Sequence, residues 1–337
     1  MLRSGRSWAC AIAVAATVTT ACSPSATTGG GGGTDRRLRV VTTVAPITSI
    51  VANVGGDLIR LTGLVPEGTN SHTFEPPPSA AKVLSQADVV FINGLKLEDP
   101  TRELAATNGK PGAVIVQLGD RAITPDEYVY DFSFPRSGGK PNPHLWTDPP
   151  LAKKYARTVA DTLRQRDAAN ATAYEANYER FANEVDELDR AMVAATATLP
   201  PERRKLLTYH DAYAYFARHY GWTVIGAVQP SSFEEPTAKE VAALITQIRQ
   251  ERVPAVFGSE VFPSPVLAQI GREAGVRYVD VLRDDDLPGK PGDPEHSWLG
   301  LMRFDYITMV DALGGDSSAL KAVKVQDTAP DRADYRQ

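Results

Sequence analysis

Five histidines occur in the 337-residue sequence, and three of them lie in short polar motifs that suit metal binding. His72 lies in NSHTFEPPPS, His144 in NPHLWTDPP and His210 in YHDAYAYF. Imidazole is the commonest protein ligand for zinc, and three imidazoles with one carboxylate complete a tetrahedral site. Both cysteines, Cys10 and Cys22, lie near the N-terminus. A metal site in the rest of the chain must therefore use imidazole and carboxylate.

Short runs rich in Val and Ile alternate with segments of helical periodicity from Leu38 onward. This alternation predicts an α/β fold of two similar lobes, each a mainly parallel sheet flanked by helices. Helices are expected to open at Pro46, Pro78 and Pro149, because proline suits a first helical turn, with Asp148 as an N-cap. We expect strands at 38–44, 58–65, 87–94 and 113–119, and a second set at 205–209, 222–228, 255–260 and 278–282.

A long helical segment separates the two sets of strands. From Tyr174 to Leu199 apolar residues recur at steps of four and three, which places them on one face of a single helix. Such a helix spans roughly 40 Å, the width of a small domain. Its continuous apolar stripe predicts that it packs along both lobes as one long rigid connector, while about four heptads leave a coiled coil as the alternative.

The three motif histidines share a position relative to these elements. His72 follows the second strand, His144 follows the loop after the fourth strand, and His210 follows the first strand of the second lobe. Ligands of α/β sheets collect at the carboxyl ends of strands. A lone histidine in such a place is more often a locally hydrogen-bonded surface residue. The acidic triplet 284–286, which follows the strand ending at Leu282, offers a carboxylate ligand, although such triplets are also common in solvated loops.

Five motifs together resemble the metal-binding solute receptors of bacterial ABC importers for zinc and manganese. They are SHTFEPPPS, NPHLWTDP, YHDAYAYFARHYG, PAVFGSEVFPSP and DDDLPGKPGDPEHSWLGLMRFD, in the family's order over residues 38 to about 320. The resemblance implies that His72, His144 and His210 each bind the metal. It implies Asp285, two residues before a Leu, as the fourth ligand. It also implies a two-lobed fold with a long linking helix and a membrane permease as partner.

The ligand set favours zinc, because manganese prefers more oxygen ligands. Receptors of the family that take manganese tend to have a carboxylate where this chain has His210, so a manganese or iron receptor is the alternative. Secreted zinc hydrolases and metal-stabilised adhesins are the rivals from other classes. A hydrolase needs an open coordination position and a nearby base. Only Glu75 and Glu260 qualify, and neither belongs to a motif such as HExxH. We expect no enzymatic activity.

The two remaining histidines have other expected roles. His219 lies near a helix end, where the helix dipole favours a positive charge. His296 lies in the same loop as the aspartates and is either a solvated loop residue or an accessory ligand that passes zinc inward.

The N-terminus indicates export. Arg3 and Arg6 precede the apolar run WACAIAVAATV, which is too short for a permanent membrane span. The run ends in TTACS, which is typical of a lipoprotein signal that lipidates Cys22, and an ordinary cleaved signal is the alternative. The following SPSATTGGGGGTD is a flexible tether. We therefore expect an extracytoplasmic protein that is anchored by lipid to the cell membrane.

Composition limits the partners. The net charge is −5, and nucleic-acid binding would need clustered Lys and Arg, so we expect no nucleic acid. The expected partners are a metal ion, the membrane surface and a permease, with the chain itself a monomer. The expected boundaries are a signal at 1–22, a tether at 23–37, an N-terminal lobe at 38–168, a linking helix at 169–200, a C-terminal lobe at 201–328 and a tail at 329–337.

Overall fold

The computed structural model describes residues 36–229, 234–259, 264–327 and 333–335. The predicted signal, the proposed lipid site at Cys22, nearly all of the tether and Glu260 lie outside these residues. The chain from Arg37 onward forms one compact unit. Within its described part, every helix is too short or too polar to cross a membrane.

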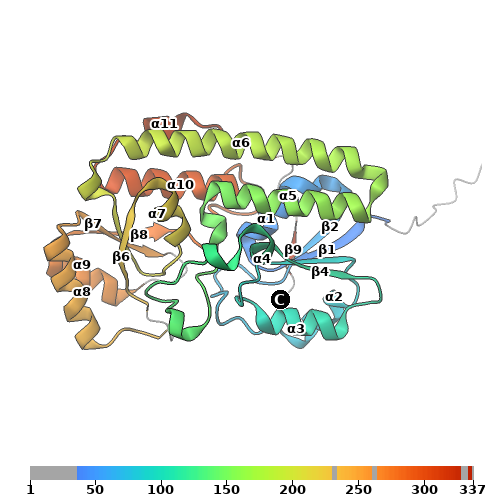
Figure 1. Cartoon of the computed structure of the whole chain (residues 1–337), viewed down its shortest axis with the longest axis horizontal. Coiled ribbons are helices and arrows are strands. Elements are labelled where there is room, and N and C mark those ends of the chain that lie inside the picture. The colour runs from blue at the N-terminus through green and yellow to red at the C-terminus, as the bar shows by residue number, and fades with distance from the viewer. Residues whose placement is uncertain (1–35, 230–233, 260–263, 328–332, 336–337) are drawn as a thin grey trace, which may run out of the picture. The chain divides into compact units, whose positions relative to one another are not determined.

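The N-terminal sheet is parallel throughout, with the strand order β4-β3-β1-β2-β9 (Figure 1). Its central strands β1 and β3 carry Val40, Val41, Val89 and Val90, all buried, as expected of strands covered on both faces. The strands are β1 (Leu38–Thr42), β2 (Ile59–Gly63), β3 (Val89–Ile92), β4 (Val114–Gln117) and β9 (Asp334–Tyr335). The helices are α1 (Ala45–Gly55), α2 (Pro78–Leu84), α3 (Asp99–Asn108), α4 (Leu118–Ala122) and α5 (Pro149–Arg166).

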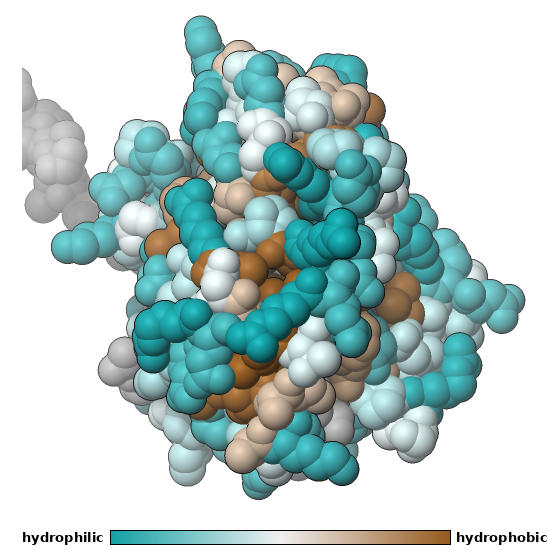
Figure 2. Space-filling model, turned by 90° about the vertical axis from the view of Figure 1, so that its left-hand side faces the viewer, coloured by the Kyte–Doolittle hydropathy of each residue, from teal (hydrophilic) through white to brown (hydrophobic). Residues whose placement is uncertain are grey.

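The C-terminal sheet is also parallel, with the order β6-β5-β7-β8. Seen from the side on which α8 and α9 lie in Figure 1, the surface of the molecule is mostly hydrophilic, with hydrophobic residues gathered in a recess (Figure 2). The strands are β5 (Lys205–Thr208), β6 (Thr223–Ala227), β7 (Ala255–Ser259) and β8 (Arg277–Leu282). The helices are α7 (Ala214–Tyr220), α8 (Ala238–Glu251), α9 (Pro265–Ala274), α10 (Trp298–Ala312) and α11 (Ser318–Ala322).

These elements confirm the predicted fold class of two parallel α/β sheets with a long helix. Each of the eight predicted strands is present, with ends that differ by a few residues at most. The helices α1, α2 and α5 begin at or next to Pro46, Pro78 and Pro149, as their prolines predicted. The short strand β9 was not predicted, and it pairs with the outer side of β2.

The long helix α6 (Ala171–Ala197) runs along both sheets (Figure 1). It packs against α1 and α5 beside the N-terminal sheet and against α7, α10 and α11 beside the C-terminal sheet. The predicted apolar stripe is buried, including Tyr174, Phe181, Val185 and Met192. Phe181 meets the indole of Trp298 edge-on, with ring centroids 5.6 Å apart. The prediction that this helix packs along both lobes is therefore confirmed.

Hydrogen bonds between buried groups add to this connection. The indole of Trp146 donates to the carbonyl of Asp284 at 2.9 Å, and the indole of Trp298 donates to the carbonyl of Trp146 at 2.9 Å. The hydroxyl of Tyr306 donates to the carbonyl of Thr147 at 2.8 Å. Since an unpaired buried donor or acceptor costs about 1–3 kcal/mol, these bonds resist separation of the segments they join.

Asp148 and His219 lie where predicted, at the N-cap of α5 and in the last turn of α7, but their side chains contact each other. Asp148 occupies the N-cap position of α5 but makes no capping hydrogen bond, because its Oδ1 contacts His219 Nδ1 instead. His219 Nε2 also lies 3.6 Å from Asp189 of α6. The contact with Asp148 raises the pKa of His219, while burial raises the pKa of Asp148 more than His219 lowers it. His219 thus joins three helices through its ring nitrogens in addition to lying at the end of α7.

Candidate metal centre

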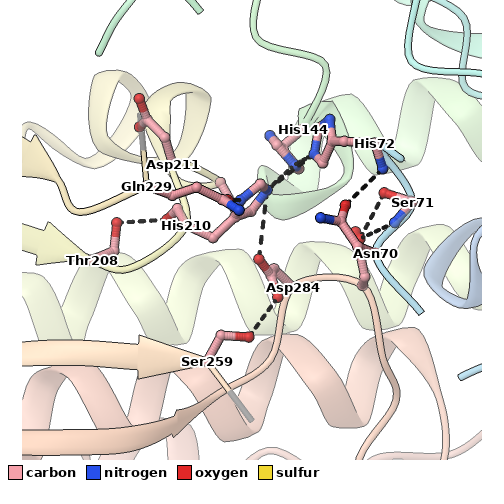
Figure 3. A network of polar contacts seen from close by, with 12 residues as sticks. Asn70, Ser71, His72, His144, Thr208, His210, Asp211, Gln229, Ser259 and Asp284 are labelled. Carbon is pink, nitrogen blue, oxygen red and sulfur yellow. Dashed lines mark hydrogen bonds and ion pairs between the residues drawn. The ribbon is translucent and has the colours of Figure 1, made fainter. Parts of the chain in front are cut away.

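Three loops bring His72, His144 and His210 together (Figure 3). His72 lies in the loop after β2, His144 precedes the short 3₁₀ turn Leu145–Thr147, and His210 follows β5. The Nε2 atom of His72 lies 3.1 Å from that of His144 and 3.1 Å from that of His210. The remaining pair, His210 and His144, is 2.9 Å apart. Within the described residues, this is the one group of at least three potential metal-binding side chains.

The spacing of the three nitrogens fits a tetrahedral zinc ion. Zinc–nitrogen bonds of about 2.0–2.1 Å place neighbouring ligands of a tetrahedron about 3.3 Å apart. The nitrogens, at 2.9 and 3.1 Å, would separate by only about 0.2–0.4 Å to reach this spacing. If each ring carries its hydrogen on Nδ1, three Nε2 lone pairs meet at these distances, which is unfavourable without a cation between them.

Amide oxygens orient two of the rings. Asn142 Oδ1 lies 2.8 Å from Nδ1 of His144, and Gln229 Oε1 lies 2.7 Å from Nδ1 of His210. Because an amide oxygen only accepts, these contacts assign the ring hydrogen to Nδ1 and leave the lone pair on Nε2. Metal-binding histidines are commonly held in this way by an acceptor behind the ring. Sequence analysis did not identify either amide.

The backbone of two of the loops repeats one local pattern. The Asn142 side chain accepts from the backbone N–H of His144 at 3.0 Å, and the Asn70 side chain accepts from that of His72 at 2.9 Å. An Asn that bonds its own chain two residues later forms an Asx turn. The sequence signal was available as Asn-x-His in both NSH and NPH. It marks loops in which the imidazole is held in a fixed direction.

The loop of His144 is further fixed to the N-terminal sheet. The side chain of Asn93, which follows β3, donates to the carbonyl of Pro143 at 2.9 Å. Its Oδ1 accepts from Tyr155 Oη of α5 at 2.6 Å. The carboxylate of Glu98 accepts from the backbone N–H of Asn93 at 2.8 Å, although burial raises the pKa of Glu98 to about 7. These buried contacts position His144 from behind.

Two buried aspartates, Asp284 and Asp285, each have one carboxylate oxygen that makes no hydrogen bond. Asp284 Oδ2 lies 3.7 Å from His210 Nε2 and makes no hydrogen bond, while its Oδ1 accepts from Ser259 at 3.2 Å. Asp285 Oδ2 accepts from the hydroxyl and the N–H of Ser71 at 2.6 and 3.3 Å, and its Oδ1 is buried without a hydrogen bond. The structure brings the three predicted histidines together, and Asp285 lies outside their immediate group. Of the two carboxylates, that of Asp284 lies 3.7 Å from a histidine nitrogen, Nε2 of His210.

Burial shifts the pKa values of these groups toward their neutral forms. Burial, and secondly the proximity of His210, lowers the pKa of His72 and of His144 well below the usual imidazole value. Burial, and secondly the charge of Asp284, raises the pKa of Asp285 to about 6. Burial also raises the pKa of Asp284. A divalent cation would reverse the cost of ionising these carboxylates, and two carboxylates balance its two charges.

A pocket beside His72 connects the site with solvent. It is lined by His72, Lys96, Phe134, Lys140 and Pro143, among others. His144 and His210 are fully buried, whereas His72 is partly exposed. His72 is therefore the one of the three histidines that borders this pocket.

Removing the acceptor behind His210 is expected to weaken metal binding. Gln229→Ala frees the ring to rotate and to change tautomer, so we expect zinc affinity to fall about 10–100-fold. Gln229→Glu keeps an acceptor at Nδ1 and is expected to retain affinity within about tenfold of the unmodified chain. Competition with a chromogenic chelator measures both variants. Equal losses in the two would show that the amide acts through packing and not through the ring.

The chain resembles known proteins in sequence and in structure. The model of the family described as zinc-uptake complex component A, periplasmic, matches residues 40–312. The manganese-binding lipoprotein MntA of Halalkalibacterium halodurans is 27% identical over 276 residues, covering 82% of this chain and 88% of the relative. The iron-binding protein YfeA of Yersinia pestis is 26% identical, covering 83% and 88%. The solved structure of the periplasmic zinc-binding protein TroA from Treponema pallidum superposes with a TM-score of 0.75 at 26% identity, covering 82% and 99%.

Proposed function

Because the chain belongs to the family of the periplasmic zinc-uptake component A, we propose that it captures a zinc ion outside the cytoplasm and delivers it to an ABC importer permease. The family consists of substrate-binding receptors and not of enzymes. The observation that carries the proposal is the convergence of three imidazole Nε2 atoms within 3.1 Å of one another. In this role the ion is cargo, which is bound, carried and released unchanged.

Zinc is the proposed metal because of the donor atoms. Relatives of the chain are named for manganese, iron and zinc, so family membership alone leaves the metal open. Three imidazoles with a carboxylate form a nitrogen-rich, four-coordinate set, which zinc accepts readily. Manganese prefers sites with more oxygen ligands and higher coordination. A manganese or iron receptor with the same architecture is the second candidate.

We propose His72, His144, His210 and Asp285 as the ligands. Asp285 Oδ1 is buried and makes no hydrogen bond, which supports its role. Asp284 Oδ2 is the competing fourth ligand, supported by its 3.7 Å distance to His210. Both carboxylates lie in the loop between β8 and α10, at adjacent positions.

The proposed location follows from the N-terminal sequence and from the relatives. MntA is named a lipoprotein, and TroA is named periplasmic. We propose that a lipid on Cys22 anchors this chain to the outer surface of the cell membrane, with residues 23–37 as the tether. A receptor held there acts as a monomer that meets its permease by diffusion in two dimensions.

The metal carried in cells tests the proposal. Protein purified without chelators from cells supplied with zinc, manganese and iron is expected to contain zinc as its main metal by mass spectrometry. In vitro affinity is a weaker test, because zinc exceeds manganese at nearly any nitrogen site. A chain loaded mainly with manganese or iron would overturn the zinc assignment. A chain without bound metal, even after incubation with each ion, would overturn the receptor function.

A further inference from the structure

A pocket on the N-terminal sheet is lined by cationic side chains from three elements. Arg39 of β1, Arg60 of β2 and Lys82 of α2 line it, together with Val41 and Leu64. Arg39 and Arg60 are register partners on neighbouring strands, so their side chains leave the same face of the sheet. The helices α2 and α3 pack on this face, opposite to α1 and α5 (Figure 1). The pocket shares no residue with the three-histidine cluster, and the proposed function does not use it.

The three cationic side chains are exposed, and the described part of the chain places no carboxylate within ion-pair distance of any of them. Arg39 Nη1 donates to the side-chain oxygen of Gln86 at 3.0 Å, which leaves the charge of the guanidinium uncompensated. Asp88 Oδ2 accepts from the backbone N–H of Arg39, but Oδ1 of the same carboxylate is paired with Lys110 Nζ at 2.6 Å. Asp334 of β9 adds a second carboxylate in register with β2. Four cations thus stand against two carboxylates here, in a chain whose net charge is −5.

The lining of the pocket suits a phosphate group that is attached to an apolar molecule. Arg binds phosphate oxygens through parallel N–H donors, and Lys binds them as a point charge. Thr62 and Ser79 line the same pocket and add hydroxyl donors. Val41, Leu64 and Val83 add apolar surface between these polar groups. An anionic phospholipid has the matching parts, because it joins a phosphate to hydrocarbon through glycerol.

The pocket is close in sequence to the proposed tether. The compact unit begins at Arg37, two residues before Arg39. A flexible tether over residues 23–37 has a root-mean-square length of about 20 Å, so a lipid on Cys22 would keep the pocket near the membrane. A surface that is held at such a high effective concentration needs only a weak contact to remain bound. Basic residues near an anionic bilayer supply a contact of this kind.

We propose that the pocket lined by Arg39, Arg60 and Lys82 binds anionic phospholipid headgroups at the membrane surface. Arg39 and Arg60 are the second residues of their strands, and Lys82 lies in the last turn of α2, so the cations gather at the amino edge of the sheet. The loop of His72 follows the carboxyl end of β2, at the opposite edge. Contact with lipid would leave the three-histidine cluster at the edge that faces away from the membrane. This orientation rests on the proposed anchor and receptor function, whereas the binding of lipid does not.

Sedimentation with vesicles tests the proposal. The chain from residue 23 onward contains the whole compact unit and lacks the lipid site and the apolar run of the signal. At low salt we expect it to bind vesicles that contain phosphatidylglycerol at least about tenfold more strongly than vesicles of phosphatidylcholine alone, and to be released at about 0.5 M salt. Arg60→Gln should lower the binding constant about fivefold. The variant Arg39→Gln/Arg60→Gln/Lys82→Gln should bind anionic vesicles no better than neutral ones, and Arg60→Gln/Lys82→Gln serves if the triple variant fails to fold.

Exposed cations of the C-terminal lobe supply the matched control. Lys239→Gln/Arg272→Gln/Arg277→Gln removes the same charge from α8, α9 and β8 and should leave the binding of vesicles unchanged. Equal binding to both kinds of vesicle, or an equal loss in the two triple variants, would overturn the proposal. Release by millimolar inorganic phosphate at constant ionic strength would overturn it too, because the pocket would then take a free anion. A chain that binds anionic vesicles but no zinc would refute the receptor function alone.

Discussion

Replacement of His144 by Ala is expected to lower zinc affinity by more than about 100-fold, beyond the 10–100-fold typical of residues that only support a ligand. The imidazole is fully buried and lies within 3.1 Å of both other imidazoles, so its loss removes a donor that water replaces poorly. Isothermal titration of the metal-free variant against zinc, with a competing chelator for the unmodified chain, measures the difference. Circular dichroism verifies that the fold survives.

The adjacent proline is the matched control for this variant. Pro143→Ala keeps the carbonyl that accepts from Asn93 and removes only the ring that restricts the backbone, so we expect a loss of about tenfold. If Pro143→Ala and His144→Ala prove equally damaging, the stretch acts through its loop and His144 is not a ligand. In the same titration, Asp285→Asn and Asp284→Asn identify the fourth ligand as the aspartate whose replacement costs more affinity.

Zinc affinity is expected to fall steeply in acid. Only neutral imidazole and ionised carboxylate bind the ion, so every proton on the free site competes with it. The pKa of Asp285 is about 6, so its protonation alone weakens binding about tenfold at pH 5. His72 and His144 have pKa values well below the usual 6.5, so they add to the loss only at lower pH. Calorimetry in buffers of different ionisation enthalpy should show little proton release per zinc at about pH 7 and more than one proton released below about pH 5, where Asp285 and the histidines both carry protons.

The variant Asp285→Asn separates the contribution of the aspartate to the pH dependence of zinc affinity from that of the histidines. In Asp285→Asn the part of the decline centred near pH 6 should disappear, while the part caused by the histidines at lower pH remains. Affinity that stays constant from about pH 7 to pH 4.5 in the unmodified chain would argue against a site of three histidines and a carboxylate.

The strands and the three histidines were predictable because their signals are local. Parallel strands covered on both faces have continuous Val and Ile runs, as in Val40–Val41 and Val89–Val90. The histidines follow strand ends, and the carboxyl ends of strands within one parallel sheet lie at a common edge. No local signal identifies Gln229 as the support of His210, because the amide comes from a segment 19 residues away that is placed by the β5–β6 pairing.

The roles of the three aspartates 284–286 were harder to predict from the sequence, for a different reason. Three consecutive aspartates have the same chemistry, and their roles differ only through their contacts. Asp284 meets Ser259 and His210, Asp285 meets Ser71, and Asp286 meets Gly68. These partners lie between 25 and 218 residues away along the chain. The strand β9 was missed because two residues carry no periodicity, and the ring of Tyr335 fits only because Gly63 opposite has no side chain.

The position of β9 determines when the N-terminal sheet can be completed during synthesis. All four strands of the C-terminal sheet come between β4 and β9 in the sequence, so the N-terminal sheet receives β9 only after the whole C-terminal sheet has been synthesised. Until then β2 is an open edge, and open edges pair with other chains. Removal of β9, or a bulky fusion next to it, would therefore expose the edge of β2. The expected result is self-association of the protein through residues 59–63, which lie far from β9 in the sequence.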